Sequence, residues 1–418
     1  MNVREPRLVV FSSLFPSSAQ PGAGLFIRER MFRVARELPL VVVSPRPWFP
    51  GQGLIRLLRP GYRPMLPAHE MQQGIEVYYP RFFALPGVLR QFDGLFMALA
   101  ALPLMWRLRH RFGFNLIDAH FAYPDGYAAA WLGRWLDVPV TLTLRGTEVP
   151  HSRNPLLRGR LQAALNRATR VFSVSESLRQ LAIGLGMPPV RGRVVGNGVD
   201  TERFRPEERH AARARYGLDD SARVLVSVGA LVERKGFHRV LAVLPELVQE
   251  QPNLHFLIVG GGSPEGNLEQ ALREQVAALG LQQQVHFLGP IAPDELRWPL
   301  SAADVFVLAT RNEGWANVFL EAMACGLPVV TTAVGGNAEV VCLPELGDVV
   351  PFDDGAALRQ ALSRALARDW DRRAIRAHAE NNGWNTRIAV LVEEFRQLVN
   401  AGAAAGTGMP LASREPMP

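Results

Sequence analysis

Two glutamates flank the start of a short helical pattern in the stretch NEGWANVFLEAMACGLPVVTT, residues 312–332. Glu313 precedes that pattern, and Glu321 follows eight positions later, about one turn into a helix that we expect to begin near Val318. Backbone amides at such a helix start, those of Asn317 and Val318, can hold a phosphate, and carboxylates accept hydrogen bonds from vicinal hydroxyls. The pattern predicts a ligand with phosphate between two sugars, a nucleotide-diphospho-sugar. The other interpretation is two surface glutamates beside a buried helix.

Two adjacent cations follow a strand in the stretch VGALVERKGFHRV, residues 228–240. Arg234 and Lys235 come directly before a glycine, where they could neutralise a departing diphosphate. Gly229, at the end of the strand, is a further candidate for contact with the donor because glycine lets a backbone approach a ligand closely. The other interpretation of the two cations is a solvated surface pair. The glycines of IVGGGSPEG lack the spacing of a dinucleotide-binding fingerprint.

Polar residues also follow strands in the first half of the chain. Gly24 lies in a glycine loop, PGAGLFIRER, after the first strand, and either contacts the donor or forms a plain turn. His120 ends a strand and Asp125 follows it, while Arg145 and Glu148 end the next strand. The carboxyl ends of parallel strands are where such folds bind ligands, so we predict that His120 and Arg145 are catalytic residues and that Asp125 and Glu148 lie on the acceptor side. A purely structural role for His120 stays open.

Short β-branched runs alternate with helical patterns over almost the whole chain, which predicts βαβ units and parallel sheets. We expect an α/β protein of two doubly wound, Rossmann-like domains, with ligands in the cleft between the carboxyl ends of their strands. The polar stretch 197–223 is the candidate linker, which gives domains over 1–205 and 206–382. The tail 401–418 is aperiodic, and we expect it to be disordered. The expected strands are 7–13, 38–45, 115–121, 138–146, 170–175, 224–230, 254–262, 285–289, 304–310 and 328–336.

The composition fits a globular enzyme with an anionic partner. The chain has 418 residues, of which 48% are hydrophobic and 20% charged, and its formal net charge is +7. Only two cysteines are present and no apolar run is long enough to span a bilayer, so we expect a cytoplasmic protein. The stretches 46–64 and 95–112 mix arginines with aromatic and apolar residues, which suits an anionic membrane surface. For 95–112 the alternative is a buried helix with a solvated basic end.

Several motifs, in order, resemble the family 4 glycosyltransferases, which are retaining enzymes of the GT-B fold. The resemblance covers roughly residues 7–400. It implies that Arg234 and Lys235 hold the donor diphosphate, that Glu313 binds the hydroxyls of the transferred sugar, and that Glu321 binds the ribose. It also implies that a helix over 383–400 crosses back onto the first domain. The motifs are NGVD with the following Phe204 and Pro206, VGALVERKG, FLIVGGG, VHFLGPI, ADVFVLAT, EGWANVFLEAMACGLPVVTT and VGGNAEVV.

The chain departs from the family pattern at three positions. Arg145 stands where many members carry histidine, Glu148 where aspartate is commoner, and Ala316 where proline is common. Arginine cannot act as a base, but Arg145 could bind a phosphate of the donor or the acceptor, and His120 lies nearby as a hydrogen-bond partner for the acceptor or the sugar.

The resemblance implies a retaining transferase for a lipid-linked or oligosaccharide acceptor, acting at the inner face of the membrane, with no cofactor besides the nucleotide sugar. We expect no metal, because the one DWD motif, Asp369 to Asp371, lies in a charged helical stretch far from any strand end. The alternatives are a sugar-nucleotide 2-epimerase and a catalytically silent scaffold of a polysaccharide assembly complex. Nucleic-acid binding rests on the basic charge alone, without a recognition motif, and we expect none.

Overall fold

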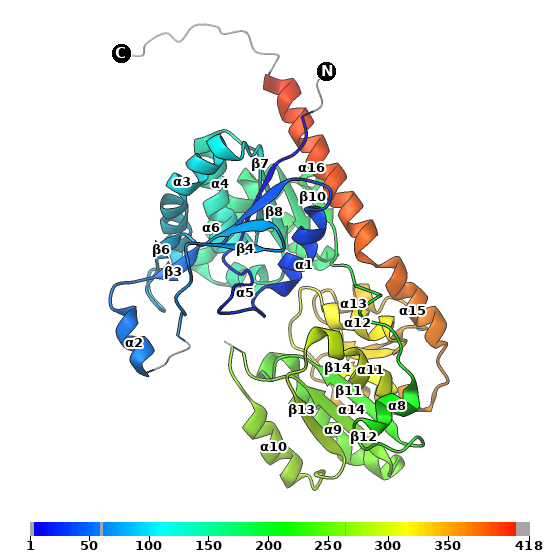
Figure 1. The fold of residues 1–418 in the computed structure, drawn as a ribbon. Helices are drawn as coiled ribbons and strands as arrows, with labels where there is room; N and C mark the ends of the chain where they lie inside the picture. The colour runs from blue at the N-terminus through cyan, green and yellow to red at the C-terminus, as the bar shows by residue number, and fades with distance from the viewer. Residues whose placement is uncertain (1–3, 59–61, 264, 407–418) are drawn as a thin grey trace, which may run out of the picture. The chain divides into compact units, whose positions relative to one another are not determined.

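The computed structural model describes residues 4–58, 62–263 and 265–406, and the chain folds into two compact units (Figure 1). Unit 1 comprises the chain up to Val174, Leu178–Val195 and the chain from Ile388 onward. Unit 2 comprises Ser175–Ser177 and Gly196–Arg387. Each unit is built on its own sheet.

Unit 1 contains an eight-stranded sheet in the order β10-β9-β8-β7-β1-β2-β5-β4. Neighbouring strands are parallel except for the pair β4 and β5. The central strands are buried along their whole length, as expected for a parallel sheet covered by helices on both faces. The strands are β1 (Leu8–Phe11), β2 (Leu40–Val43), β4 (His69–Gln72), β5 (Ile75–Tyr78), β7 (Leu116–His120), β8 (Val140–Leu144), β9 (Arg170–Ser173) and β10 (Gly192–Val194).

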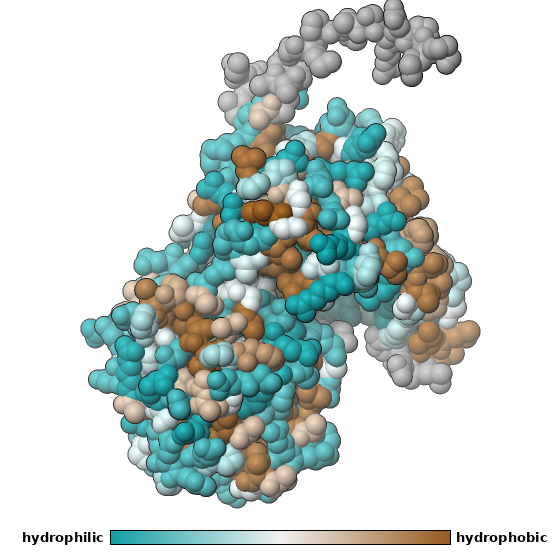
Figure 2. Space-filling view, turned by 180° about the vertical axis from the view of Figure 1, so that it is seen from behind, coloured by the Kyte–Doolittle hydropathy of each residue, from teal (hydrophilic) through white to brown (hydrophobic). Residues whose placement is uncertain are grey.

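A small parallel ribbon of β3 (Arg46–Trp48) and β6 (Arg81–Phe83) lies outside the main sheet of unit 1. Helix α3 packs against this ribbon and against α4. Figure 2, seen from behind, shows hydrophobic residues along the flank that carries α3 and α2. The helices are α1 (Leu25–Val34), α2 (Gln52–Leu58), α3 (Asp93–Arg111), α4 (Tyr127–Leu136), α5 (Glu148–Arg153), α6 (Pro155–Arg167) and α7 (Glu176–Gly184), which belongs to unit 1 from Leu178 onward. Short turns lie at Arg90–Phe92, Ala122–Gly126 and Pro189–Arg191.

Unit 2 contains a six-stranded, fully parallel sheet in the order β13-β12-β11-β14-β15-β16. The chain runs outward from β11 to one edge and then returns to β14, which pairs with β11 from the other side. This reversal is a topological switch point, where α/β sheets bind ligands outside the carboxyl ends of their strands. The strands are β11 (Arg223–Val228), β12 (Leu254–Val259), β13 (Val285–Gly289), β14 (Val305–Leu308), β15 (Val329–Thr332) and β16 (Gly347–Val350).

Helices cover both faces of the unit 2 sheet and form two hydrophobic cores. One core joins the sheet to α9, α10 and α14, and the other joins it to α8, α11, α12 and α15. The helices are α8 (Arg209–Ala214), α9 (Phe237–Glu250), α10 (Glu269–Ala278), α11 (Arg297–Ala302), α12 (Asn317–Ala324), α13 (Asn337–Val340), α14 (Gly355–Ala367) and α15 (Arg372–Asn381), with short turns at Glu233–Lys235 and Pro293–Glu295.

All ten predicted strands are present, each within a few residues of its expected bounds. The stretch 197–223 is not a free linker. Its Phe204, Ala212 and Leu218 are buried in a core of unit 2, because its apolar residues are spaced for a helix and turns rather than for a strand. The DWD motif has a structural role, since the Asp371 carboxylate caps α15 by accepting hydrogen bonds from two backbone amides.

The last helix, α16 (Trp384–Gly406), begins in unit 2 and belongs to unit 1 from Ile388 onward. Within unit 1 its Phe395 ring packs edge-on against Phe172 at 5.9 Å, and Glu394 pairs with Arg170 at 2.9 Å. Residues 401–406, which we expected to be part of a disordered tail, form the end of α16. The rest of that tail, 407–418, lies outside the described residues.

Candidate functional site

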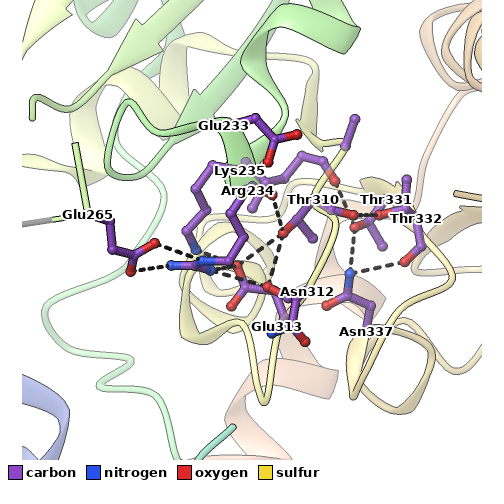
Figure 3. A network of polar contacts seen from close by, with 12 residues as sticks. Glu233, Arg234, Lys235, Glu265, Thr310, Asn312, Glu313, Thr331, Thr332 and Asn337 are labelled. Atoms are coloured by element: carbon purple, nitrogen blue, oxygen red, sulfur yellow. Dashed lines mark hydrogen bonds and ion pairs between the residues drawn. The ribbon is translucent and has the colours of Figure 1, made fainter. Parts of the chain in front are cut away.

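The switch point of unit 2 brings two predicted segments together. Strand β11 leads to the turn Glu233–Lys235, and its neighbour β14 leads to the loop 309–316 before α12. Side chains from both segments meet in one polar network (Figure 3). Residues almost eighty positions apart in the sequence thus form one cluster because their strands are adjacent in the sheet.

Two cations of this network converge on one carboxylate. Lys235 Nζ lies 2.5 Å from Glu313 Oε1, and Arg234 Nη1 lies 3.2 Å from the same oxygen. Arg234 Nη1 also donates to the Asn312 carbonyl at 3.2 Å. The side chains of Lys235 and Glu313 are only 15% and 10% exposed, so they are held in a fixed arrangement under a partly solvated Arg234. Three of the predicted donor-site residues are therefore in direct contact.

Glu265 completes the cluster and was not among the predicted residues. Its carboxylate receives Arg234 in a two-pronged contact, with Nη2 at 3.0 Å and Nε at 3.1 Å. This hydrogen bond lowers the pKa of Glu265. Burial alone would lower the pKa of Arg234, but the two carboxylates outweigh it and raise the pKa. Arg234 therefore stays a cation. The sequence signal that could have identified Glu265 is an acidic residue in the glycine-rich stretch that follows β12.

Backbone contacts hold the two cations in place. The Arg234 carbonyl accepts hydrogen bonds from the Thr310 hydroxyl at 2.9 Å and from the Arg311 amide at 2.8 Å. Gly236, which follows Lys235, has φ +76°, and a Cβ there would lie 1.8 Å from the Ala309 carbonyl oxygen. Only glycine fits this position, because both the backbone angle and the space exclude a side chain.

Gly229 lies beside Lys235, and Gly260 lies beside Gly229. A Cβ at Gly229 would make an ordinary contact with the Lys235 side chain, 3.6 Å away. At Gly260, φ is +144° and a Cβ would lie 1.8 Å from the Gly229 carbonyl oxygen. The steric need for glycine is therefore at Gly260, which lets the end of β12 approach the end of β11. The predicted contact of Gly229 with a donor stays a prediction.

The glycine turn after β15 supports the Glu313 loop from behind. Gly335 has φ +52°, and a Cβ there would lie 1.7 Å from the Glu313 carbonyl oxygen. Asn337 anchors this turn, donating from Nδ2 to the Thr331 hydroxyl at 3.1 Å and to the Thr332 carbonyl at 3.0 Å. The position of Glu313 is thus determined on both sides, by the two cations and by this turn.

Helix α12 begins at Asn317, one residue before the predicted start. Its N-cap, Ala316, makes no side-chain capping hydrogen bond. The Asn317 side chain accepts a hydrogen bond from Asn197 Nδ2 at 2.8 Å. Glu321 lies one turn further along α12 and is half-buried. The predicted geometry of the helix start is present, and the roles of Asn317, Val318 and Glu321 toward a ligand stay predictions.

Unit 1 has a corresponding switch point between β1 and β7. The loop after β1 and the turn after β7 are joined by Asp125, whose carboxylate accepts hydrogen bonds from the Ser13 amide and, at 3.0 Å, from the Ser13 hydroxyl. Asp125 is 1% exposed, and burial raises its pKa to about 7 against the effect of these hydrogen bonds. The Gly24 loop packs onto the same segment, since a Cβ at Gly24 would lie 2.6 Å from the Leu14 carbonyl oxygen.

His120 and Arg145 are in contact at the ends of β7 and β8. Arg145 Nε donates to His120 Nδ1 at 3.1 Å, so the neutral ring carries its proton on Nε2, 3.4 Å from Asp118 Oδ2. His120 has no exposed surface, and burial together with the Arg145 charge lowers its pKa to about 4. Burial and the nearby Arg30 charge lower the pKa of Arg145 well below its usual value. Arg145 also stacks over the Phe26 ring at 5.0 Å.

Glu148 joins the ends of the same two strands through backbone amides. Oε1 accepts from the Ala122 amide at 2.9 Å, and Oε2 accepts from the amides of Arg145 and Gly146 at 3.1 and 2.8 Å. The side chain is 1% exposed. In this structure the carboxylate fixes the two loops, and the predicted contact of Glu148 with the acceptor stays a prediction.

Two family profiles match the chain, one on each side of the predicted domain boundary. The family described as "Glycosyltransferase Family 4" matches residues 55–203, and "Glycosyl transferases group 1" matches residues 208–382. The putative teichuronic acid biosynthesis glycosyltransferase TuaC of Bacillus subtilis (strain 168) is 31% identical over 339 residues, which cover 79% of this chain and 82% of that protein. The chain belongs to glycosyltransferase family 4.

Other relatives of this family 4 glycosyltransferase agree with that assignment. The D-inositol 3-phosphate glycosyltransferase of Rhodococcus opacus (strain B4) is 33% identical over 355 residues, which cover 75% of this chain and 77% of that protein. The structure of Anabaena Alr3699/HepE in complex with UDP has a TM-score of 0.70 at 19% identity and covers 94% of this chain and 100% of that one. The predicted GT-B fold and the predicted family are confirmed.

The described residues of this family 4 glycosyltransferase contain neither a membrane-spanning helix nor a cluster of metal ligands. Within 4–58, 62–263 and 265–406, no helix is both long and apolar enough to cross a bilayer. In the same parts of the chain, no three His, Cys, Asp or Glu side chains come together as ligands for a metal ion.

Proposed function

We propose that this glycosyltransferase takes a sugar from a nucleotide-diphospho-sugar and transfers it, with retention of configuration and without a metal ion, to a lipid-linked or oligosaccharide acceptor. The product would be a cell-surface or exopolysaccharide precursor made at the inner face of the cell membrane. The names of the relatives support this substrate class, since one acts in teichuronic acid biosynthesis and others on inositol 3-phosphate. UDP in the complex of the Anabaena protein supports a nucleotide donor.

The observation that carries the proposal is the convergence of Lys235 and Arg234 on Glu313. Cleavage of the bond between sugar and diphosphate leaves negative charge on the departing nucleotide. Fixed cations that meet this charge as it develops lower the barrier, because they need no rearrangement at the moment of reaction. Two side-chain cations beside the start of α12 supply that charge in our proposal, so no step requires a metal or another cofactor.

Glu313 orients the transferred sugar in this proposal and does not attack it. Its Oε1 already accepts contacts from Lys235 at 2.5 Å and from Arg234 at 3.2 Å. An oxygen engaged by two cations is a poor base and a poor nucleophile, whereas the carboxylate can still accept hydrogen bonds from sugar hydroxyls. The acceptor then attacks from the side that the nucleotide leaves, and a diphosphate oxygen takes its proton. This route retains the configuration.

The remaining predicted residues divide between donor and acceptor. Glu321, one turn into α12, would bind the ribose hydroxyls of the nucleotide. Arg145, the half-buried cation at the end of β8, would bind a phosphate on the donor or the acceptor, with His120 holding its guanidinium in place. Asp125 and Glu148 would then act on the acceptor side by fixing the loops that carry these groups.

The first test is a thermal-shift panel of UDP-, GDP- and ADP-linked sugars in the presence of EDTA, on the wild type and on Glu321→Ala. We expect one nucleotide family to raise the melting temperature, since a ligand that binds only the folded state stabilises it by mass action. The variant should lose this response, while Glu393→Ala, an exposed change on α16, should keep it. No response to any nucleotide would contradict the proposal.

The second test follows the sugar. The purified protein is incubated with the donor selected by the panel and a lipid-extract acceptor, again with EDTA, and the anomeric configuration of the product is determined by NMR. Transfer with unchanged configuration supports the proposal. Inversion, a need for added metal, or conversion of the donor sugar without any acceptor would each contradict a stated part of it.

A further inference from the structure

Helix α3 of unit 1 has an apolar stripe on its exposed side. Its buried side packs Met97, Ala101, Met105 and Leu108 against the rest of unit 1. A surface helix ordinarily presents polar residues on the opposite side. Here the opposite side carries Phe96, Leu99, Pro103, Trp106 and His110, and Phe92 of the preceding turn continues the row. These residues alternate in steps of four and three and so share one face.

This outer stripe is exposed to solvent. Leu99 is 51% exposed and Trp106 is 60% exposed, while Phe92 is 37% exposed. The alternative of a buried helix with a solvated basic end does not describe this side of α3, because only the side formed by Met97, Ala101, Met105 and Leu108 packs against unit 1. A solvent-exposed apolar stripe of this length indicates that something covers it in use.

The apolar surface continues onto the neighbouring elements of unit 1. The Phe83 ring on β6 contacts Phe96 of the stripe edge-on at 5.8 Å, and Phe83 pairs in register with Trp48 on β3. Beyond this ribbon, α2 presents Leu54 and Leu57, which are 69% and 79% exposed. Figure 2 shows hydrophobic surface along one flank of unit 1. The apolar flank is defined here as α2, the ribbon β3/β6 and the outer stripe of α3.

The positive charge of the whole protein is concentrated in the same segment. Residues 46–111 contain nine arginines and three acidic residues, which gives +6 out of the +7 of the chain. One of the acids, Glu76, is paired with Arg111. Exposed arginines lie directly beside the apolar flank, with Arg107 next to Trp106 and Arg90 before the first turn of α3. The covering partner must therefore be apolar at its centre and anionic around it.

We propose that the apolar flank docks onto the anionic surface of a lipid bilayer, with the rings of the outer stripe among the headgroups and the arginines on lipid phosphates. Amphipathic helices with aromatic residues and flanking arginines bind such interfaces in this way. A second copy of the chain is a poorer partner, because it would bring an equal excess of positive charge to the same contact. The inference rests on the proposed function, in which a lipid-linked acceptor is used at the membrane.

The test is co-sedimentation of the full-length protein with vesicles of phosphatidylcholine alone and with vesicles that contain 30% phosphatidylglycerol. We expect binding to the anionic vesicles that weakens at 0.5 M salt, and at most weak binding to neutral vesicles. The double variant Leu99→Ser, Trp106→Ser should lower the apparent affinity at least tenfold. The matched control is Leu156→Ser, Val190→Ser, which changes two side chains of unit 1 that are 65% and 80% exposed and lie outside the apolar flank.

A second pair of variants tests the charge. Arg90→Gln, Arg107→Gln should weaken binding to the anionic vesicles several-fold and reduce its salt dependence, while Arg158→Gln, Arg396→Gln should not. Equal binding by all variants, no binding to anionic vesicles, or a wild-type dimer that the Leu99, Trp106 variant converts to a monomer would each overturn the inference. The nucleotide-induced thermal shift is measured on the same samples: its presence without vesicle binding refutes the docking surface alone, and its absence refutes the proposed function.

Discussion

The two switch points of this glycosyltransferase occupy the same place in their sheets but use their polar residues differently. In unit 2, Arg234, Lys235 and Glu313 contact one another through their side chains, and Arg234 reaches solvent. In unit 1, Glu148 and Asp125 are almost completely buried, and most of their contacts are with backbone amides.

This difference separates groups that can meet a ligand from groups that hold loops. The side chains of an ion cluster can exchange one charged partner for another, because the backbone of each residue is held in place independently of these ion pairs. A buried carboxylate bonded to three amides cannot exchange them without opening the loops that they belong to. A glutamate at the same place in the two sheets therefore need not have the same role. Whether it can meet a ligand depends on how deeply the residue and its hydrogen-bond partners are buried.

The largest expected effect comes from removing a cation of unit 2. Lys235→Ala should lower kcat/KM by about 10²–10³-fold, because a fixed charge at the departing diphosphate is lost. Arg273→Ala, which removes an exposed cation from α10, is the control of equal charge change. Steady-state transfer with the donor found in the thermal-shift panel measures both. Wild-type kcat/KM in Lys235→Ala would remove the basis for a ligand-binding role of this cluster.

A smaller effect is expected from moving Glu313 without changing it. Gly335→Ala places a Cβ where the Glu313 carbonyl lies, 1.7 Å away, at φ +52°. We expect KM for the donor to rise about tenfold or more, an estimate based on the cost of small misplacements in an active site. Gly74→Ala is the matched control, since Gly74 also has positive φ but no atom within 4 Å of the added Cβ. It should lose only about 1 kcal/mol of stability.

The corresponding change in unit 1 should affect stability first. Glu148→Gln replaces one carboxylate oxygen, which only accepts hydrogen bonds, by an amide NH₂ group, which only donates them. At least one of the three backbone amides then loses its acceptor, which should lower the free energy of unfolding by about 2–4 kcal/mol and lower the melting temperature. The nucleotide-induced shift in unit 2 should persist. If the melting temperature were unchanged and KM for the acceptor rose, Glu148 would contact the acceptor directly and the contrast between the two units would fail.

The smallest effect is a pair of opposite pH dependences within unit 1. The folded pKa of Asp125 is raised to about 7, so its contribution to stability is present at low pH and is lost as pH rises from about 4 to about 7. The folded pKa of His120 is lowered to about 4, so its contribution is present above about pH 6.5 and is lost as pH falls toward 4. In the wild type the two slopes oppose each other.

Single variants should uncover these slopes. Between pH 4 and 6.5, Asp125→Asn should become more stable with rising pH relative to the wild type, and His120→Asn should become less stable. Each difference should reach about 1 kcal/mol per pH unit at most. Denaturant unfolding at a series of pH values measures it. Parallel curves for all three proteins would show that neither group changes its protonation on folding.

Much of the fold could be predicted because central strands of a parallel sheet are buried on both faces and read as continuous β-branched runs. The runs LVVF and LVVV show this for β1 and β2. The missed strands are short or lie at sheet edges, such as β4 with the sequence HEMQ, where half of the residues face solvent and no such run is needed.

The candidate site was predicted in part for similar reasons. Lys235 and Glu313 each follow a strand, so the fold class alone places both at one edge of the sheet. Glu265 was missed because it follows a glycine-rich turn of no regular period, and only the folded chain brings it to Arg234. The need for glycine at Gly335 depends on a contact with a carbonyl 22 positions earlier, which no local pattern encodes.

Glu265 and Glu313 have a consequence for selectivity against the many small anions of a cell. Together they balance Arg234 and Lys235, so the four side chains sum to no net charge. Free inorganic phosphate would have to displace a carboxylate that is already well placed, and it gains little by doing so. In our proposal a nucleotide sugar brings further contacts through its ribose and its sugar. The cluster would then bind a complete nucleotide sugar and would bind its fragments, such as free phosphate, only weakly.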